Sequence, residues 1–239
     1  MHLHSILFCA LGAAITVSAA PEDRGSRKLP STVVPECPRK GKVVFSKSVP
    51  EGTKFPKTQV DLCYSTKTSK ASPMLHLTFT AFDEKDFHFN PKQGMNDDIW
   101  EYSVMEAFIQ RGHEAPQTYL EFEVNPNNVT YQSFIYNPSR VRAENTPMDH
   151  AFISDPTGDG MVAKTTLDRK AKIWISDVQI PLALFNVPER GLRGTRWRMN
   201  FFRTITSPET FPEQKLGAWS PPDKANFHIT PFFGNVVFI

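Results

Sequence analysis

The sequence has little cysteine, no excess of charge of one sign and no long apolar run beyond its N-terminal leader. Its 239 residues carry 27 Lys and Arg against 25 Asp and Glu, a formal net charge of +2, without long runs of either sign. This balance gives no indication of a nucleic-acid partner. No segment approaches membrane-spanning length, so the sequence predicts no membrane span and no tail anchor.

Helical patterns and common catalytic motifs are also missing. The chain contains no internal repeat, no heptad pattern and no long amphipathic helix, and a single helical turn is expected within residues 182–187. It also contains no G-x-S-x-G or H-E-x-x-H motif and no Cys–His arrangement. These absences favour an all-β, non-catalytic protein.

The N-terminus has the composition of a secretory signal peptide. An apolar run from Ile6 to Val17, too short to span a bilayer, ends in the small residues at 18–20. We therefore expect a signal peptide over residues 1–19 and a secreted, extracellular mature protein. Residues 20–39 are polar and contain proline, which predicts a flexible lead-in, and residues 40–239 are expected to form one folded domain.

Two cysteines remain after removal of the signal peptide. Cys9 leaves with the leader, and Cys37 and Cys63 stay in the mature chain. In an oxidising compartment the default for such a pair is one disulfide. A single sequon begins at Asn128, which suits a secreted glycoprotein and predicts that Asn128 lies on the surface.

Short runs of β character recur along the chain between turn residues. Residues 74–82 alternate between apolar and polar side chains, as expected of a half-buried strand. Similar runs occupy 43–45, 58–64, 104–109, 118–124, 129–136, 170–179, 197–205 and 235–239. The sum predicts an all-β fold, an antiparallel β-sandwich of jelly-roll type.

Two of these runs carry acids among apolar residues. In the run at 104–109, Glu106 shares a face with Val104 and Phe108, because side chains alternate along a strand. In the run at 118–124, Glu121 and Glu123 share a face with the residue at 119. If the two strands are neighbours, three carboxylates lie close together and repel one another unless polar or cationic groups use them.

The order of five motifs resembles that of the family 9 carbohydrate-binding modules and related extracellular domains. The resemblance covers about 58–239. The motifs are DDIW with MEAF at 97–108, YLEFEVNPNN at 119–128, KIWISDVQIPLALF at 172–185, RWRMNFFR at 196–203, and AWSP with FFG at 218–221 and 232–234.

The resemblance implies a sandwich that holds the end of a sugar chain between two tryptophans, without catalysis. Trp100 matches the first of them, Trp219 resembles the second, and Glu106 matches a hydroxyl-binding acid. The chemistry is reasonable, because pyranose C–H patches lie against flat aromatic rings while the hydroxyls need polar partners. The expected partner is a polysaccharide or oligosaccharide, with cell-wall glycan a candidate. The predicted carbohydrate-binding residues are Trp100, Glu106, Tyr119, Glu121, Glu123, Arg203 and Trp219.

No cofactor is required by the sequence, but calcium is a candidate. Some relatives in the resembled group bind calcium structurally, and three acidic loops, at 83–86, 97–98 and 155–159, offer oxygen ligands. The candidate ligands are Asp83, Asp86, Asp97 and Asp98. Simple acidic turns are the alternative interpretation of these loops.

Three other functions compete with sugar binding. The acids could serve as the paired carboxylates of a glycoside hydrolase. A related class of sandwich carries haem between Met and His ligands, and the chain has Met105 and scattered histidines. A third alternative is a secreted protein-interaction module that has kept the sandwich and lost sugar binding.

Overall fold

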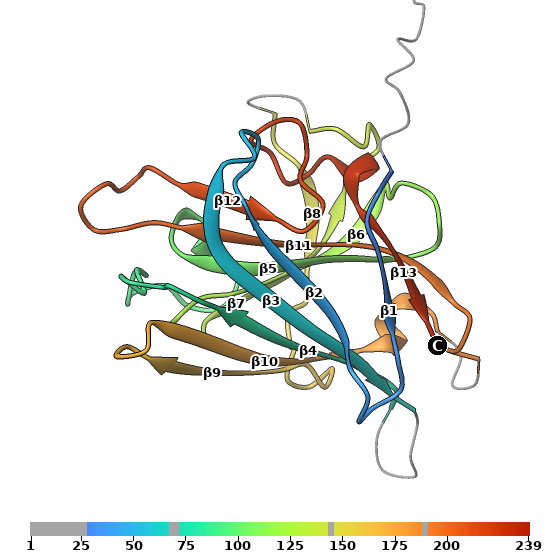
Figure 1. The fold of residues 1–239 in the computed structure, drawn as a ribbon. Helices are drawn as coiled ribbons and strands as arrows, with labels where there is room; N and C mark the ends of the chain where they lie inside the picture. Colours follow the sequence, from blue (N-terminus) through green and yellow to red (C-terminus); the bar gives the residue numbers. More distant parts are fainter. Residues whose placement is uncertain (1–27, 67–71, 143–145, 188–190) are drawn as a thin grey trace, which may run out of the picture.

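A computed structural model describes residues 28–66, 72–142, 146–187 and 191–239, and in this part of the chain thirteen strands and three 3-10 helices form two packed sheets (Figure 1). The strands are β1 Ser31–Val34, β2 Gly41–Lys47, β3 Lys54–Ser65, β4 Met74–Ala81, β5 Val104–Arg111, β6 Thr118–Val124, β7 Thr130–Tyr136, β8 Asp149–Phe152, β9 Val162–Asp168, β10 Ile173–Pro181, β11 Arg196–Ile205, β12 Lys215–Ala218 and β13 Gly234–Phe238. The short helices are η1 Ile99–Glu101, η2 Leu182–Phe185 and η3 Thr230–Phe232. The predicted β-sandwich is confirmed.

The two sheets differ in size. The larger has eight strands in the order β1-β13-β11-β5-β6-β7-β8, with β12 also paired to β11. The smaller has five strands in the order β2-β3-β4-β10-β9. The paired strands are antiparallel apart from β1, which runs parallel to β13 at one edge of the larger sheet (Figure 1).

The main core lies between the sheets and follows from the alternation along the strands. In β4, buried Leu75, Leu77 and Phe79 alternate with partly exposed polar residues. The facing sheet contributes side chains such as Met105 and Phe201, and the rings of Phe79 and Phe201 meet edge to face, 6.3 Å apart. Each strand of the core thus presents its apolar face to the opposite sheet.

A buried ion pair also joins the two sheets. Arg203 on β11 faces the core with no exposed side-chain surface, and its Nη2 donates to Glu84 Oε2 at 2.9 Å. Its Nη1 donates to the carbonyl of Phe82 at 3.1 Å and to Thr58 Oγ1 at 3.3 Å. Pairing with Glu84 and these further bonds offset the desolvation of the guanidinium.

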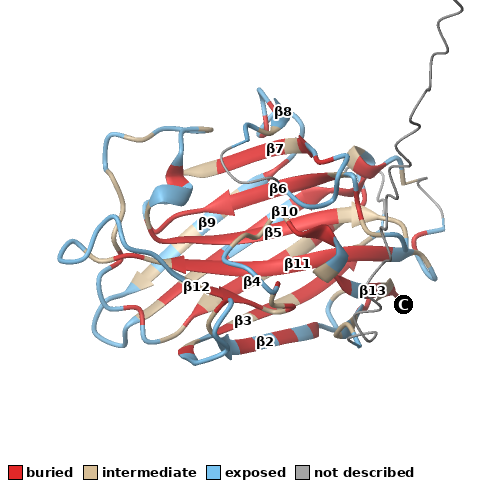
Figure 2. Ribbon diagram, turned by 90° about the horizontal axis from the view of Figure 1, so that it is seen from above, coloured by how far each residue is buried: buried red, intermediate tan, exposed pale blue. Residues whose placement is uncertain are grey.

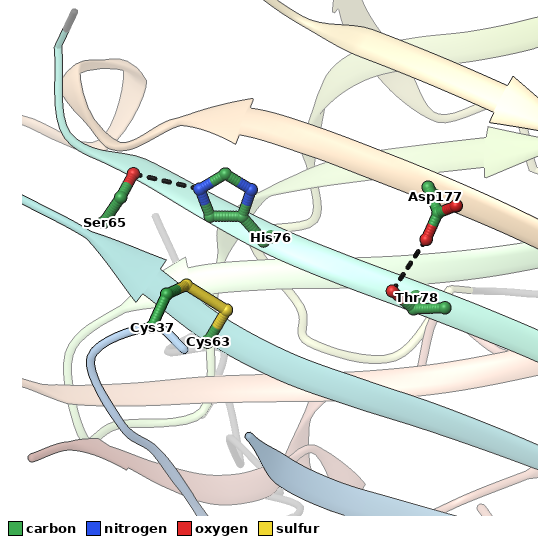
Figure 3. The surroundings of a disulfide bond; sticks show 6 residues. All are labelled: Cys37, Cys63, Ser65, His76, Thr78 and Asp177. Atoms are coloured by element: carbon green, nitrogen blue, oxygen red, sulfur yellow. Dashed lines mark hydrogen bonds between the residues drawn. A yellow bond between two sulfur atoms is a disulfide. The ribbon is translucent and has the colours of Figure 1, made fainter. Parts of the chain in front are cut away.

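The N-terminal segment corrects the predicted lead-in at 20–39. Residues 31–34 form β1, because Thr and Val suit a strand and β13 offers a free edge for pairing. After β1 the chain bonds to β3, with the amide of Cys37 donating to the carbonyl of Tyr64 at 2.9 Å. The Cys37–Cys63 disulfide, confirmed with an S–S distance of 2.10 Å, covalently fixes this crossing (Figure 3).

Three further predictions concern the signal peptide, the absence of a membrane span and the sequon at Asn128. The signal peptide at 1–19 lies outside the described residues. Within them, no helix is long and apolar enough to cross a membrane. Asn128 is exposed on the β6–β7 turn, as expected, and its glycosylation stays a prediction.

Candidate functional site

Strand register places the three glutamates together on the outer face of the larger sheet, the face turned away from the smaller sheet. Glu106 on β5 is paired directly with Glu123 on β6. Glu121 lies two residues before Glu123, on the same face of β6, and is paired with Phe108 on β5. A carboxylate oxygen from each of the three lies within 4.8 Å of the others. The predicted pairing of the two acidic strands is therefore confirmed.

The rest of this outer face is covered, and it combines aromatic side chains with buried polar residues such as Asn200 and Thr204. Phe108, Tyr119 and Phe202 are fully buried there, in a second cluster that is separate from the core between the sheets. The ring of Phe108 lies 4.9 Å from that of Phe202 and 6.0 Å from that of Phe233, which comes from the segment after β12. As a result, β5 and β11 are buried along most of their length, as the red colour of these strands in Figure 2 shows.

Burial makes the three glutamates weak acids. Glu106, Glu121 and Glu123 expose 3%, 6% and 1% of their surface. Desolvation raises the pKa of Glu121 to about 8. Desolvation, together with the neighbouring carboxylates, raises the pKa of Glu106 and of Glu123 well above the ordinary value.

The hydrogen bonds within the cluster are few. Thr204 Oγ1 on β11 donates to Glu106 Oε1 at 3.4 Å. The carboxyl groups of Glu121 and Glu123 are in hydrogen-bond contact, which requires a proton on one of them. The other oxygen of Glu123, Oε2, is buried and has no hydrogen-bond partner in the described structure.

A cavity of about 470 Å³ opens above these acids. Its volume falls in the range of small-molecule sites, about 300–1,000 Å³. It is lined by Asp98, Trp100, Glu106, Glu121, Glu123, Tyr131, Ile135, Arg142, Met148, His150, Thr204, Gln214, Leu216, Ala225, Asn226, Phe227 and His228. The walls therefore come from η1, from β7 and β8, and from the segments before and after β12.

Trp100 supplies the exposed aromatic surface of the cavity. It sits in η1, where its neighbour Ile99 is fully buried and anchors the turn. The carbonyl of Trp100 accepts a hydrogen bond from Gln214 Nε2 at 2.8 Å, and its indole N–H donates to Asp98 Oδ1 at 3.4 Å. These bonds fix the indole while 47% of the residue stays exposed.

His228 closes the cavity on the side of Tyr119. Its Nδ1 is 2.7 Å from the hydroxyl of Tyr119, and its Nε2 is 3.8 Å from Glu121 Oε1. Desolvation, with a smaller effect of Arg142, lowers the pKa of His228 to about 3, so the ring is neutral at neutral pH. The imidazole therefore adds a polar wall without adding charge.

Three predicted sugar-binding residues, Tyr119, Arg203 and Trp219, do not line this cavity. Tyr119 is fully buried on the outer face, where its hydroxyl contacts His228. Trp219 packs beside the core between the sheets, with its ring 5.9 Å from that of Phe201 and its indole over Gly234. A Cβ at Gly234 would lie 2.4 Å from Trp219 Cζ3, so the glycine is what makes room for the ring. Arg203 points into the same core. The arrangement of Trp100 and Trp219 as two sides of one sugar site is thus corrected.

The predicted calcium ligands also remain apart. Asp97 Oδ2 caps a turn by accepting the amide hydrogen of Gly94 at 2.7 Å, and Asp98 accepts from Trp100. Among the described residues, the one group of acidic, His or Cys side chains close enough to share a metal ion is the cluster of Glu106, Glu121 and Glu123. Asp83, Asp86, Asp97 and Asp98 do not form such a ligand set.

Several lining residues were missed by the sequence interpretation. Tyr131 is the cross-strand partner of Glu123, and this placement follows once β6 and β7 are taken as neighbours. Arg142, Gln214, Phe227 and His228 come from irregular segments, where no periodicity marks the direction of a side chain. Phe227 stacks on Phe202 at 4.1 Å and so continues the buried aromatic cluster up to the cavity.

The β-sandwich is similar in fold to solved structures of other proteins. A Bacteroides uniformis protein to which a carbohydrate-binding role has been attributed superposes with a TM-score of 0.62 at 17% identity, over 89% of this chain and 100% of that one. A family 9 carbohydrate-binding module from Caldicellulosiruptor kristjanssonii, solved with glucose, gives a TM-score of 0.52 at 12% identity, over 88% of this chain and 96% of that one. At these identities the likeness concerns the fold.

A full-length relative is known from Arthroderma benhamiae. It is named "Extracellular protein" and is 53% identical over 239 residues, which is 100% of both chains. The chain belongs to the family of this protein and is extracellular. No family model matches the sequence.

Proposed function

We propose that the protein binds carbohydrate, without catalysis, in the cavity above Glu106, Glu121 and Glu123. The observation that supports this most directly is the combination of an exposed indole, Trp100, with a group of oxygen acceptors in one cavity. A sugar ring has an apolar face for the indole and hydroxyls for the acceptors. The floor of the site, two neighbouring strands of a sheet, holds these acceptors rigidly.

The polar groups of the cavity suit hydroxyls better than an anionic ligand. Thr204, buried beside Glu106, and the exposed Gln214 offer neutral polar groups, and Tyr131 contributes a further aromatic ring. Because Arg142 stands among four acidic residues, the cavity has no strong positive field for an anionic ligand. The carbohydrate-binding roles attributed to the structural neighbours, one of them solved with glucose and with cellotriose, support the same class of ligand.

A glycan array followed by calorimetry tests the proposal, with glucose and cellotriose among the first probes. We expect Trp100→Ala to lower the affinity for the bound glycan about tenfold or more, because the aromatic contact is lost. Tyr136→Ala is the matched control, since Tyr136 is 48% exposed, against 47% for Trp100, and does not line the cavity. This control should bind like the parent.

Two results would refute the proposal. One is an array on which the correctly folded parent binds no glycan, which would favour a protein-interaction module. The other is a parent-like affinity in Trp100→Ala, which would remove the site from this cavity.

A further inference from the structure

The three glutamates form a compact group of buried carboxyl groups on two neighbouring strands. Their carboxylate oxygens lie within 4.8 Å of one another, on two strands whose register fixes them. In the part of the chain that the structure describes, no Lys or Arg nitrogen lies within ion-pair distance of any of them. His228 Nε2 is 3.8 Å from Glu121 Oε1, and Arg142 lines the same cavity beyond ion-pair distance of the three carboxylates.

A second observation comes from Glu123 itself. The residue is 1% exposed and lines the cavity, yet its Oε2 is buried without a hydrogen-bond partner. Buried polar atoms are nearly always bonded, and an unbonded carboxylate oxygen is especially costly. An oxygen in this position, beside two further carboxylates, suggests a partner that brings positive charge from outside the protein.

We propose that Glu106, Glu121 and Glu123 bind a divalent metal ion at the floor of the cavity. An all-carboxylate set favours a hard cation over thiophilic metals. Oxygens up to 4.8 Å apart can share one ion of calcium's size, whose bonds to oxygen are about 2.3–2.6 Å long. Magnesium, with bonds of about 2.0–2.1 Å, fits that separation less well.

The surroundings complete the coordination of such an ion. Three protein oxygens leave several positions of a calcium ion open, and the cavity above has room for water or for other oxygen ligands. The ion would compensate the buried charges and occupy the space next to Glu123 Oε2. The site differs from the aspartate loops, because its ligands lie on rigid strands.

Calorimetry on protein stripped with a chelator tests this site with the metal alone. The stripped parent is titrated with Ca²⁺, and separately with Mn²⁺, Mg²⁺ and Zn²⁺. We expect one equivalent of Ca²⁺ to bind more tightly than Mg²⁺ and to raise the melting temperature. Tb³⁺, which substitutes for Ca²⁺, should show luminescence sensitised by Trp100 and Tyr131, since both line the cavity.

Variants assign the ion to the cluster. Glu123→Gln and Glu106→Gln should each weaken Ca²⁺ binding by about tenfold or more, because each removes one of three charged ligands. Glu101→Gln removes an exposed acid outside the cavity and should bind like the parent. Near-UV circular dichroism checks the fold of each variant, and loss of a repelling charge should leave the metal-free fold intact.

The titration contains no glycan, so its result is independent of the proposed carbohydrate binding. The metal site is refuted if the stripped parent binds none of the four ions at millimolar concentration, whatever the variants do. It is equally refuted if Glu123→Gln and Glu106→Gln bind Ca²⁺ as tightly as the parent. Tighter binding of Zn²⁺ than of Ca²⁺, with the imidazole of His228 as a ligand, would overturn the assignment to a hard cation.

Discussion

The outer faces of the two sheets are built in opposite ways. On the five-stranded sheet the outer face is open, and its polar side chains pair with one another near the surface. Figure 3 shows two such pairs, Ser65 with His76 at 2.9 Å and Thr78 with Asp177 at 2.8 Å. On the eight-stranded sheet the outer face is covered by the segments around β12, and the polar residues enclosed there include the three acids Glu106, Glu121 and Glu123.

The difference shows where function is to be sought in this sandwich. A polar residue on an open face is solvated, so its presence needs no further explanation. A carboxylate under a covered face loses its water, and the fold must then provide a proton, a cation or a ligand. Glu106, Glu121 and Glu123 are of this second kind, which is why both proposals depend on them.

The largest effect is expected from removing a buried side chain on the covered outer face, compared with removing an exposed one on the open outer face. Phe108→Ala, under the covered face, should lower the free energy of unfolding by about 3–5 kcal/mol, because a fully buried ring is removed. Val44→Ala, on the outer face of β2 and 46% exposed, should cost less than about 0.5 kcal/mol. Urea unfolding measures both, and equal costs would contradict the comparison.

Substitution should distinguish the two tryptophans that the motifs suggested as a pair. Trp219 should contribute to stability and Trp100 to glycan binding. Trp219→Ala should cost about 2–4 kcal/mol, since the partly buried ring fills the space over Gly234, and the folded variant should bind glycan like the parent. Trp100→Ala should change stability by less than about 0.5 kcal/mol. Thermal unfolding combined with calorimetry checks this, and a loss of affinity in well-folded Trp219→Ala would restore the original pairing.

Much of the fold was predictable because the alternation of side chains is a local signal. The strand at 74–81, η2, and the face shared by Glu121 and Glu123 all follow from short windows of sequence. The strands that were not predicted from the sequence are short or lie at the edge of a sheet. β1, β8 and β12 have four residues each, and β9 is polar along its exposed side, so neither length nor apolar content marks them.

The site was predicted in part, and its errors come from long-range contacts. Trp219, next to Ser220 and Pro221, has the sequence surroundings of a loop edge, and its burial depends on Gly234. Arg203 lies on the same side of β11 as Phe201, so alternation alone places it in the core, but its partner Glu84 is 119 residues away in sequence. His228 comes from a segment without periodicity and meets Glu121 only through the fold.

A pH dependence of stability should also distinguish the covered face from the open one. In metal-free protein the pKa of Glu121 is raised from 4.5 to about 8 by burial, so between these values the folded state binds more protons than the unfolded state. Stability attributable to this group therefore falls as pH rises through that window, by at most about 1.4 kcal/mol per pH unit. Glu121→Gln lacks the group, so its stability relative to the parent should increase from pH 4.5 to 8 and level off above.

His228 acts in the opposite direction over part of this range. Its pKa, lowered to about 3 from 6.5, makes stability rise with pH between those values in the parent and in the variant. The difference between the two proteins therefore reports Glu121 together with Glu106 and Glu123, whose charges interact with it. Urea unfolding in chelator at several pH values measures that difference. Asp177→Asn on the open face is the control, and a rise of the same size there would contradict the explanation by burial. Added Ca²⁺ should reverse the result for Glu121, because an ion held by ionised carboxylates stabilises the parent most at high pH and cannot do so fully in Glu121→Gln.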